Sequence, residues 1–260
     1  MELTEILDLL ELRYRTSGYA TKLFTSDRSL LLRLGVHPQD AQLSDLENII
    51  LAGKKQSTRA HYASRLKSLF QTLNQMKVID NDPTKELPKI KKTRGVPKPI
   101  TKREFQALLD EANEPYRDWF ILAGYAGLRA MEVANIEGKD LEETETGYSL
   151  RILGKGGTDL IVPVAEVVAQ AILKHKTLGR LWDVNPNKLS KYAADEMRRI
   201  LGENAKHFHS LRHYFATTML EKSGGDLMAV KELMRHTSVA TTQIYTQLAQ
   251  GRTRSLVDLL

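Results

Sequence analysis

Six residues between the middle of the chain and its end have side chains that together suit chemistry on a phosphodiester. They are Arg129, Lys155, His209, Arg212, His236 and Tyr245. Attack on a phosphodiester needs positive charge against the non-bridging oxygens, a deprotonated nucleophile and a proton for the leaving oxygen. Because the pKa of free tyrosine is about 10, forming its phenolate at pH 7 costs roughly 4 kcal/mol, which nearby cations reduce. Arginines suit this task because their forked donors bind phosphate bidentately. We therefore predict that fixed cations hold a phosphodiester and that Tyr245 attacks it.

Several of these residues have a simpler interpretation when each is taken alone. An isolated Arg129 is typical of a surface or helix-terminal arginine, and Lys155 is typical of a solvated lysine in a glycine-rich turn. That turn is not a phosphate-cradling P-loop, because the Gly-x4-Gly-Lys-Ser/Thr spacing is missing. His209 and His213, four positions apart, have a spacing that suits metal ligands. Since Ser210 stands where a zinc-protease motif has glutamate, we expect no metal.

Tyr245 is one of nine tyrosines, so its selection as the nucleophile needs an argument. Tyr62 and Tyr125 lie in apolar helical contexts that predict core packing, and Tyr214 lies on a helix that we expect to be buried. Tyr245 alone follows a histidine, His236, by nine positions in a polar, threonine-rich stretch. The sequence therefore favours Tyr245.

The elements that must position these residues are mainly helical. A capping box formed by Thr101 and Glu104 opens the C-terminal part. Two helices and three extended runs are then predicted, over about 102–112, 116–127, 140–143, 148–153 and 159–164. The last two runs flank a glycine-rich turn, which predicts a β-hairpin with Lys155 at its tip. Since helical patterns then resume, we predict a mainly α fold with a small antiparallel β-sheet, an α+β catalytic domain.

The N-terminal part has the pattern of a helical bundle. Of its four expected helices, the first carries an apolar stripe from Leu3 and the second includes the leucines at 30–34. The third covers about 43–51, and the fourth runs from a cap at Ser57 to about Met76. The fourth buries five predicted core residues, Tyr62, Leu66, Leu69, Phe70 and Leu73. Four of the eight prolines then fall between Asp82 and Ile100 among lysines, which is typical of a linker. We predict a helical DNA-binding domain over 1–84, a basic linker over 85–99, and a catalytic domain with a C-terminal tail over 100–260.

Composition narrows the class of protein. The 260 residues suit two domains, and 42% hydrophobic residues suffice for ordinary cores. The sequence has no apolar run long enough to cross a membrane, and the acidic amphipathic start lacks the parts of a signal peptide. The absence of cysteine excludes disulfides, thiolate zinc sites and thiol nucleophiles. We expect a cytoplasmic protein.

Basic residues are concentrated in one half of the chain. The net charge is +6, and no acidic residue lies between Asn48 and Ile79. Charge runs are usually solvated faces. Two adjacent basic runs instead favour a surface that follows DNA phosphates, and the fourth helix is our candidate for a DNA groove. The candidate DNA-binding residues are Lys54, Lys55, Arg59, Arg65, Lys67, Lys91, Lys92 and Arg94.

Several segments match the pattern of one enzyme family in order and spacing. They are Ala126-Gly127-Leu128-Arg129 with Glu132, Gly154-Lys155-Gly156, His209-Ser210-Leu211-Arg212-His213, and His236 followed by Thr241-Thr242-Gln243-Ile244-Tyr245. With these motifs, the C-terminal part resembles the catalytic domain of the tyrosine recombinases, the phage integrase and Xer group. The N-terminal part resembles the helical core-binding domain of that family, and we expect no separate arm-binding domain before it.

The resemblance implies a role for each residue. Tyr245 attacks the scissile phosphate, which gives a 3′-phosphotyrosyl link and a free 5′-hydroxyl. Arg129 and Arg212 hold the non-bridging oxygens, and Lys155 protonates the leaving 5′-oxygen. In religation, a 5′-hydroxyl of the partner duplex attacks the phosphotyrosine, so no nucleotide or other cofactor is expected.

The remaining site residues have supporting roles in the same resemblance. His209 takes the base position, His236 hydrogen-bonds the phosphate, and Glu132 orients Arg212 or its framework. His213 is either structural or assists in the phosphate pocket. The chain departs from the family where Leu-Gly-His is common, because Arg235 replaces the glycine there. We expect this arginine to alter the turn slightly or to add a phosphate contact.

The resemblance also implies partners and leaves alternatives open. The expected partner is double-stranded DNA at recombination sites, with four protomers exchanging strands through a Holliday junction. The apolar C-terminal tail packs either on its own domain or into a neighbouring protomer. We favour a phage or mobile-element integrase, with an accessory directionality protein left open. The alternatives are chromosomal Xer-type dimer resolution, type IB topoisomerase-like relaxation and a non-catalytic DNA-binding relative.

Overall fold

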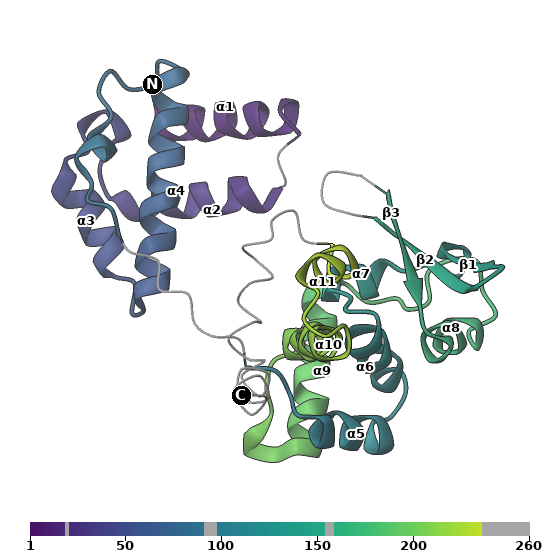
Figure 1. Cartoon of the computed structure of the whole chain (residues 1–260). Coiled ribbons are helices and arrows are strands. Elements are labelled where there is room, and N and C mark those ends of the chain that lie inside the picture. The colour runs from purple at the N-terminus through teal and green to yellow at the C-terminus, as the bar shows by residue number, and fades with distance from the viewer. Residues whose placement is uncertain (19–20, 91–97, 154–158, 236–260) are drawn as a thin grey trace. The chain divides into compact units, whose positions relative to one another are not determined.

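The structure is a computed structural model that describes residues 1–18, 21–90, 98–153 and 159–235 (Figure 1). The chain divides into two compact units, Met1–Gly95 and Val96–Leu260. Each unit has a hydrophobic core of its own. The division lies within 85–99, the segment whose composition predicts a linker.

The N-terminal unit is a helical bundle. It contains α1 (Leu3–Thr16), α2 (Thr21–Leu34), α3 (Leu43–Leu51) and α4 (Gln56–Gln75), with short 3-10 helices η1 (Pro38–Asp40) and η2 (Pro83–Glu86). Helix α4 begins at Gln56 after an N-cap at Lys55, so Ser57 is not the cap that the sequence predicts. The predicted core residues of α4 are buried, except that Tyr62 is only partly buried. Helix α4 therefore supplies much of the core of this unit.

The start of the predicted linker packs onto this bundle. Leu87 is buried in the core of the N-terminal unit, and Ile90 packs against it. The Lys67 ammonium donates a hydrogen bond of 3.0 Å to the Leu87 carbonyl. The N-terminal end of the predicted linker therefore packs with the N-terminal unit.

The C-terminal unit combines helices with one small sheet. Its described elements are α5 (Lys102–Glu111), α6 (Tyr116–Tyr125), α7 (Ala130–Asn135), η3 (Gly138–Asp140), β1 (Leu141–Thr144), β2 (Gly147–Leu153), β3 (Asp159–Val164), α8 (Glu166–Leu173), α9 (Pro186–Leu201), η4 (Gly202–Asn204), α10 (His209–Lys222) and α11 (Leu227–Leu233). The mainly helical fold with a small antiparallel sheet confirms the predicted fold class. The Thr101 hydroxyl accepts from the Glu104 amide, and the Glu104 carboxylate accepts from the Thr101 amide, as the predicted capping box requires.

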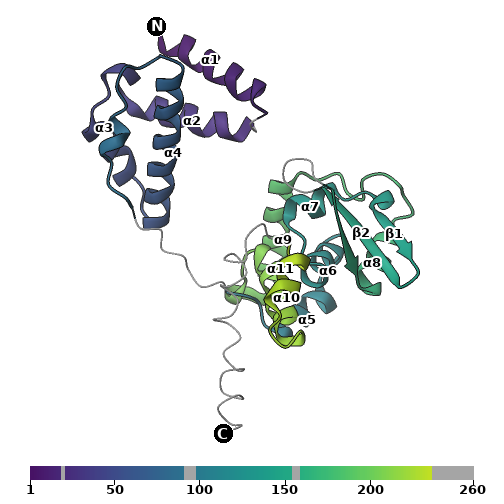
Figure 2. The same ribbon diagram turned by 45° about the horizontal axis from the view of Figure 1, so that its top comes forward.

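The sheet is an antiparallel meander in the order β1-β2-β3. Leu150 and Ile152 on β2 and Val162 on β3 are buried, whereas Arg151 between them is exposed. Figure 2 shows α8 beside the sheet, and α8 contacts β2. This alternation fixes the register Leu153↔Asp159 at the end of the hairpin.

Helix α6 is the central helix of the C-terminal unit. Its residues from Asp118 to Gly124 are buried, which confirms the predicted core helix, although it ends at Tyr125 rather than Gly127. Helix α10 packs on α6, and α11 packs on α10 through Val230 and Met234. These contacts bring α7, α10 and the end of α11 close to one another. None of the described helices is long and apolar enough to span a membrane.

Candidate active site

A glycine turn at the end of α6 places Arg129. Gly127 has φ +61°, in the left-handed region that favours glycine. A Cβ there would lie 2.5 Å from Cδ1 of Phe215 on α10, so only glycine fits. Leu128 is then fully buried, and Arg129 becomes the N-cap of α7. The Ala-Gly-Leu-Arg motif is thus a turn that holds one arginine at the junction of α6 and α7.

Glu132 lies among three arginines. Its carboxylate accepts from the Arg129 amide (2.8 Å) and from Arg129 Nη1 (2.6 Å). It also accepts from Arg235 Nη2 at 3.0 Å, and Arg212 Nη1 lies 3.8 Å away. Burial would raise the pKa of Glu132, but the charge of Arg235 and the hydrogen bonds and charge of Arg129 hold that pKa below its ordinary value. One carboxylate therefore stays ionised against three cations.

Arg212 projects from the first turns of α10 into this cluster. Its side chain is only 1% exposed and donates to the carbonyls of Gly127 and Met234. By contrast, the Arg129 side chain remains 40% exposed. Arg212 is fixed by carbonyls of two other segments, whereas Arg129 is fixed on one side by Glu132 and reaches solvent on the other. The structure thus brings together two of the arginines that the sequence identifies.

His209 and His213 lie one helical turn apart on α10, with ring centroids 4.6 Å apart. Burial and the positive charges of Arg212 and Arg129 lower the pKa of His209 below its ordinary value. Burial, His209 and Arg212 lower the pKa of His213 to about 4. His209 is therefore neutral near pH 7 and able to accept a proton. Within the described ranges, no three His, Asp or Glu side chains are grouped in a way that would hold a metal.

The two histidines also line a basic hollow. It has a volume of about 390 Å³ and is lined in addition by Lys98, Lys206 and His207. The Lys206 ammonium donates to the Pro99 carbonyl (2.9 Å) and lies 3.2 Å from Glu104. The hollow is a place where a negatively charged backbone can lie beside His209.

The predicted residues Lys155, His236 and Tyr245 lie outside the described residues, as do Lys91, Lys92 and Arg94. The structure does describe the residues that flank them. Leu153 and Asp159 close the paired part of the hairpin, and α11 ends at Leu233, shortly before His236.

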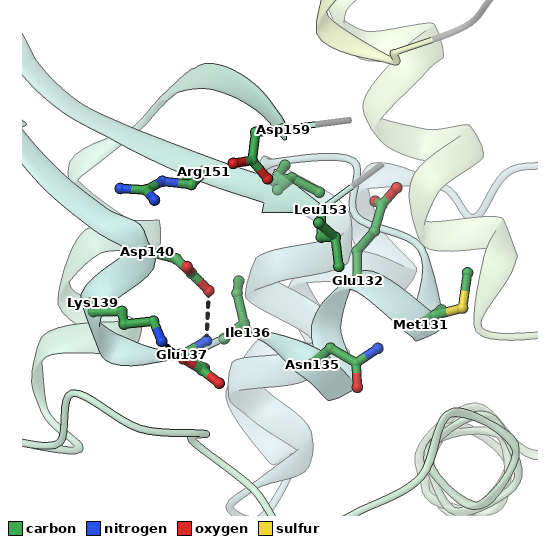
Figure 3. Close-up of a pocket in the computed structure, with 11 residues that line it drawn as sticks. Met131, Glu132, Asn135, Ile136, Glu137, Lys139, Asp140, Arg151, Leu153 and Asp159 are labelled. Carbon is green, nitrogen blue, oxygen red and sulfur yellow. Dashed lines mark hydrogen bonds and ion pairs between the residues drawn. The ribbon is translucent and has the colours of Figure 1, made fainter. Parts of the chain in front are cut away.

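The ends of the hairpin border a second hollow. Figure 3 shows it between α7 and the strands, with Glu132 beside Leu153. It has a volume of about 500 Å³ and is lined by Met131, Asn135, Asp140, Arg151 and Asp159 among others. Leu153 and Asp159, the described residues on either side of the Lys155 segment, therefore line the same hollow as Glu132.

Arg235 is a site residue whose contacts the sequence does not predict. Its side chain is 2% exposed and its guanidinium binds Glu132, so it belongs to the same cluster as Arg129 and Arg212. The one local sign in the sequence is that Arg235 stands at a position where the family that this chain resembles often has glycine. Of the two expectations for Arg235, a slightly altered turn or an added phosphate contact, its burial against Glu132 does not support the phosphate contact.

The basic residues of the N-terminal unit divide into two groups. Arg65 binds the fully buried Asp27, and its side chain is only 15% exposed, which does not suit the DNA contact predicted for it. Arg59 Nε donates to the Gly53 carbonyl at 2.7 Å, and Lys67 binds Leu87 as described above. Lys54 and Lys55 are instead exposed where α4 begins. Of the five predicted residues of this unit that the structure describes, only this last pair is fully presented to solvent.

The structure also describes two of the tyrosines for which the sequence predicts burial, Tyr214 and Tyr125. Tyr214 is partly buried and packs against the main core of the C-terminal unit. Tyr125 is 37% exposed, so its predicted core position is wrong, although its ring meets that of Phe105 edge-on at 5.1 Å. An exposed phenol at the end of α6 results because the helix turns away at Gly127.

Comparisons with known proteins agree with this geometry. The phage integrase family matches residues 98–252. Tyrosine recombinase XerD of Yersinia pestis is 33% identical, over 89% of this chain and 84% of that protein. Tyrosine recombinase XerC of Shewanella amazonensis is 36% identical, over 72% of this chain and 68% of that protein.

Solved structures show the same fold. A lambda integrase (75-356) dimer bound to a COC′ core site has a TM-score of 0.73 at 16% identity, covering 94% of this chain and 95% of that one. The XerH site-specific recombinase bound to palindromic difH, in a post-cleavage complex, has a TM-score of 0.64 at 19% identity, covering 84% and 72%.

Proposed function

The chain belongs to the phage integrase family of tyrosine recombinases and is a site-specific DNA recombinase, and we propose that it cuts DNA by attack of Tyr245 on a phosphate held by Arg129 and Arg212. The observation that carries this proposal is the cluster around Glu132. One ionised carboxylate faces three arginines there, so the cluster keeps a surplus of positive charge. A surplus of fixed cations stabilises the charge that develops on a phosphate under attack.

Fixation of the arginines matters as much as their charge. Arg129 is held through its amide and Nη1, so its fork does not need to be ordered when DNA arrives. Its exposed fraction of 40% leaves it accessible to a phosphate from solvent. Arg212 would complete the contact from inside the cluster.

The proton transfers follow from the same surroundings. Neutral His209 accepts the tyrosine proton as the bond between the phenol oxygen and phosphorus forms. The bond between phosphorus and the 5′-oxygen breaks, and Lys155 gives that oxygen a proton while His236 hydrogen-bonds the phosphate. The products are a 3′-phosphotyrosyl link and a 5′-hydroxyl. Attack by another 5′-hydroxyl reverses the step, so the energy of the bond is kept and no cofactor is required.

The N-terminal unit is proposed to bind the core DNA site. Exposed Lys54 and Lys55 would contact phosphates, together with Lys91, Lys92 and Arg94. The proposed domains remain 1–84 for DNA binding, 85–99 as a basic linker and 100–260 for catalysis. The protein would act in the cytoplasm, where it meets DNA.

The proposed assembly is a homotetramer on DNA that exchanges two pairs of strands through a Holliday junction. A lambda integrase tetramer bound to a Holliday junction has the same fold, with a TM-score of 0.69 at 17% identity. The apolar residues of the tail are proposed to dock on a neighbouring protomer. They are Leu256, Val257, Leu259 and Leu260.

A recombination assay tests this function. DNA sites are first selected from a randomised duplex library with the Tyr245→Phe variant, which is expected to bind but not cut. Two copies of a selected site should then give Holliday junctions and exchanged products with the wild type in EDTA, and neither with Tyr245→Phe. Relaxation of supercoiled plasmid without junctions would instead indicate a topoisomerase-like enzyme.

The biological role has two candidates. We favour integration of phage or mobile-element DNA, and we leave open whether an accessory directionality protein takes part. Chromosomal dimer resolution is the second candidate, because XerD of Yersinia pestis and XerC of Shewanella amazonensis each match more than two thirds of this chain. Direct repeats that flank the gene at the ends of an inserted element would support integration. A selected site that matches a single chromosomal sequence far from the gene would support dimer resolution.

A further inference from the structure

Arg235 occupies a position that is unfavourable for an arginine in two respects. Its φ is +53°, a left-handed conformation that is unfavourable for a residue other than glycine. Its side chain is only 2% exposed, and a buried guanidinium is costly unless it is paired and hydrogen-bonded. A residue persists under these conditions when its contacts over-determine the conformation.

The contacts of Arg235 join three segments of the C-terminal unit. Its Nη2 donates to the Gly127 carbonyl (2.9 Å) and to the Glu132 carboxylate (3.0 Å). Its Nη1 donates to the Leu233 carbonyl (2.9 Å) and, more weakly, to the Ala126 carbonyl (3.4 Å). The side chain thus connects the end of α11 to the turn between α6 and α7 and to the carboxylate on α7.

Two acceptors of Arg235 are shared with the proposed phosphate-binding arginines. Glu132 also accepts two hydrogen bonds from Arg129, and the Gly127 carbonyl also accepts a hydrogen bond from Arg212. Arg212 additionally binds the carbonyl of Met234, the residue directly before Arg235. A change at Arg235 therefore acts on both arginines through atoms that they already use.

The chain direction adds a further consequence. Arg235 is directly followed by His236 and, after nine more positions, by Tyr245. The residue directly before His236 is therefore held against Glu132. Arg235 therefore ties the start of the nucleophile-bearing segment to the two arginines that the nucleophile must meet.

We propose that Arg235 is a positioning residue that sets Arg129 and Arg212 for the scissile phosphate through Glu132 and the Gly127 carbonyl. This inference rests on the proposed roles of Arg129, Arg212 and Tyr245. It assigns no direct contact between Arg235 and DNA, because the guanidinium is buried and turned toward protein acceptors.

The test compares an ordinary scissile phosphate with a neutral methylphosphonate at the same place in a selected duplex. The methyl group removes the negative charge that the arginines neutralise, so the positions of the arginines matter less for it. Arg235→Met keeps most of the bulk of the side chain and removes its charge. Arg235→Gly removes the whole side chain and suits the left-handed backbone conformation at this position. Each variant is measured for single-turnover cleavage and for duplex affinity.

We expect Arg235→Met and Arg235→Gly to cleave the ordinary duplex roughly 10- to 100-fold more slowly, since small misplacements of catalytic groups have effects of this size. Duplex affinity should change less than about threefold, as expected when only the transition state loses stabilisation. On the methylphosphonate, the defect should shrink to below about threefold. Arg235→Lys, which keeps the charge but not the fork, should fall between the wild type and Arg235→Met.

Arg199→Met is the matched control. Arg199 on α9 also binds a nearly buried glutamate, Glu196, and a carbonyl, that of Glu111, but in another part of the unit. We expect the Arg199→Met variant to cleave both the ordinary duplex and the methylphosphonate duplex at the wild-type rate. A defect of equal size on both substrates for Arg235→Met and Arg235→Gly, or no defect at all, would overturn the inference. If Arg235→Met does not fold, Arg235→Gly decides alone.

The same experiment separates this inference from the proposed function. Arg129→Ala and Arg212→Ala should show larger defects that the methylphosphonate also reduces. If they do so while the Arg235 variants do not, only the inference fails. If the wild type forms no Tyr245-dependent adduct with any selected duplex, the proposed function fails and the inference fails with it.

Discussion

Both units of this chain bury a carboxylate against arginine, and the two clusters differ in charge balance. In the N-terminal unit, fully buried Asp27 accepts from Arg65 and from the Tyr14 hydroxyl. In the C-terminal unit, Glu132 meets three arginines, one of them 40% exposed. The first cluster balances one negative charge with one positive charge. The second keeps excess positive charge at the surface, which is the arrangement that binds an anion.

The balanced cluster of the N-terminal unit also includes a tyrosine, Tyr14, whose hydroxyl donates to Asp27. Burial, with the hydrogen bond and the charge of Asp27, raises the pKa of Tyr14 to about 12. A phenol in such surroundings is a poorer nucleophile than free tyrosine. An excess of cations has the opposite effect on a phenol, and this is what Tyr245 requires. Carboxylate and arginine side chains therefore build a balanced cluster in one unit and, in the other, a cluster with excess positive charge where we propose that Tyr245 reacts.

Replacement of the exposed arginine should give the largest effect. Arg129→Ala removes a fixed cation from the phosphate, and we expect single-turnover cleavage to fall by about 10³-fold. The unfolding midpoint in urea should hardly move, because the side chain is 40% exposed. Near-normal cleavage would contradict the assignment of Arg129 to the phosphate.

The matching change in the balanced cluster should affect stability instead. Asp27→Asn leaves Arg65 without its counter-charge, which we expect to destabilise the N-terminal unit by about 3 kcal/mol. Both tryptophans, Trp119 and Trp182, lie in the C-terminal unit, so their fluorescence reports that unit alone. Circular dichroism should therefore show an earlier first transition in urea while the tryptophan transition stays in place. A shift of both transitions would mean that the units do not unfold separately.

The histidines predict a pH dependence of stability that is specific to the C-terminal unit. His213 has a folded pKa of about 4, below its ordinary value of 6.5, so the unfolded chain binds the proton more readily. The stability that neutral His213 contributes is complete above pH 6.5 and is lost as the pH falls towards about 4. We expect a loss of about 2 kcal/mol, discounted for partial exposure, in the tryptophan transition. His213→Gln should flatten this dependence, and an unchanged slope would contradict it.

The smallest expected effect concerns the basic residues of α4. Replacing Lys54 and Lys55 by alanine should weaken duplex binding about tenfold at 0.1 M salt. The salt slope, which is the steepness with which the logarithm of the binding constant falls with the logarithm of the salt concentration, should decrease by about 2. Arg65→Met should leave the salt slope unchanged, because its partner is Asp27 and not DNA. Titrations by fluorescence anisotropy at several salt concentrations measure both slopes. A lower slope for Arg65→Met would restore the original interpretation of that residue.

Local signals in the sequence predict the framework well. The capping box at Thr101, the hairpin strands and the apolar run of α6 follow from neighbouring residues, and the structure contains each of them. Partners distant in sequence are not predictable in this way. Arg65 meets Asp27 across 38 positions, and Arg235 meets Glu132 across 103. Helical periodicity assigns a residue to a face, but long side chains such as that of Arg65 reach around the helix to an acceptor that no local pattern marks.

The most direct test of the central claim is the identity of the covalent link. Wild type and Tyr245→Phe are incubated in EDTA with a selected duplex that carries a nick beside the scissile phosphate, so that religation is prevented. The trapped complex is digested with nuclease and protease and analysed by mass spectrometry. We predict a single peptide that carries a nucleotide on Tyr245 through its 3′-phosphate, and no modified peptide from the variant. A nucleotide on another residue, a 5′-phosphate link, or no adduct from the wild type would contradict the claim.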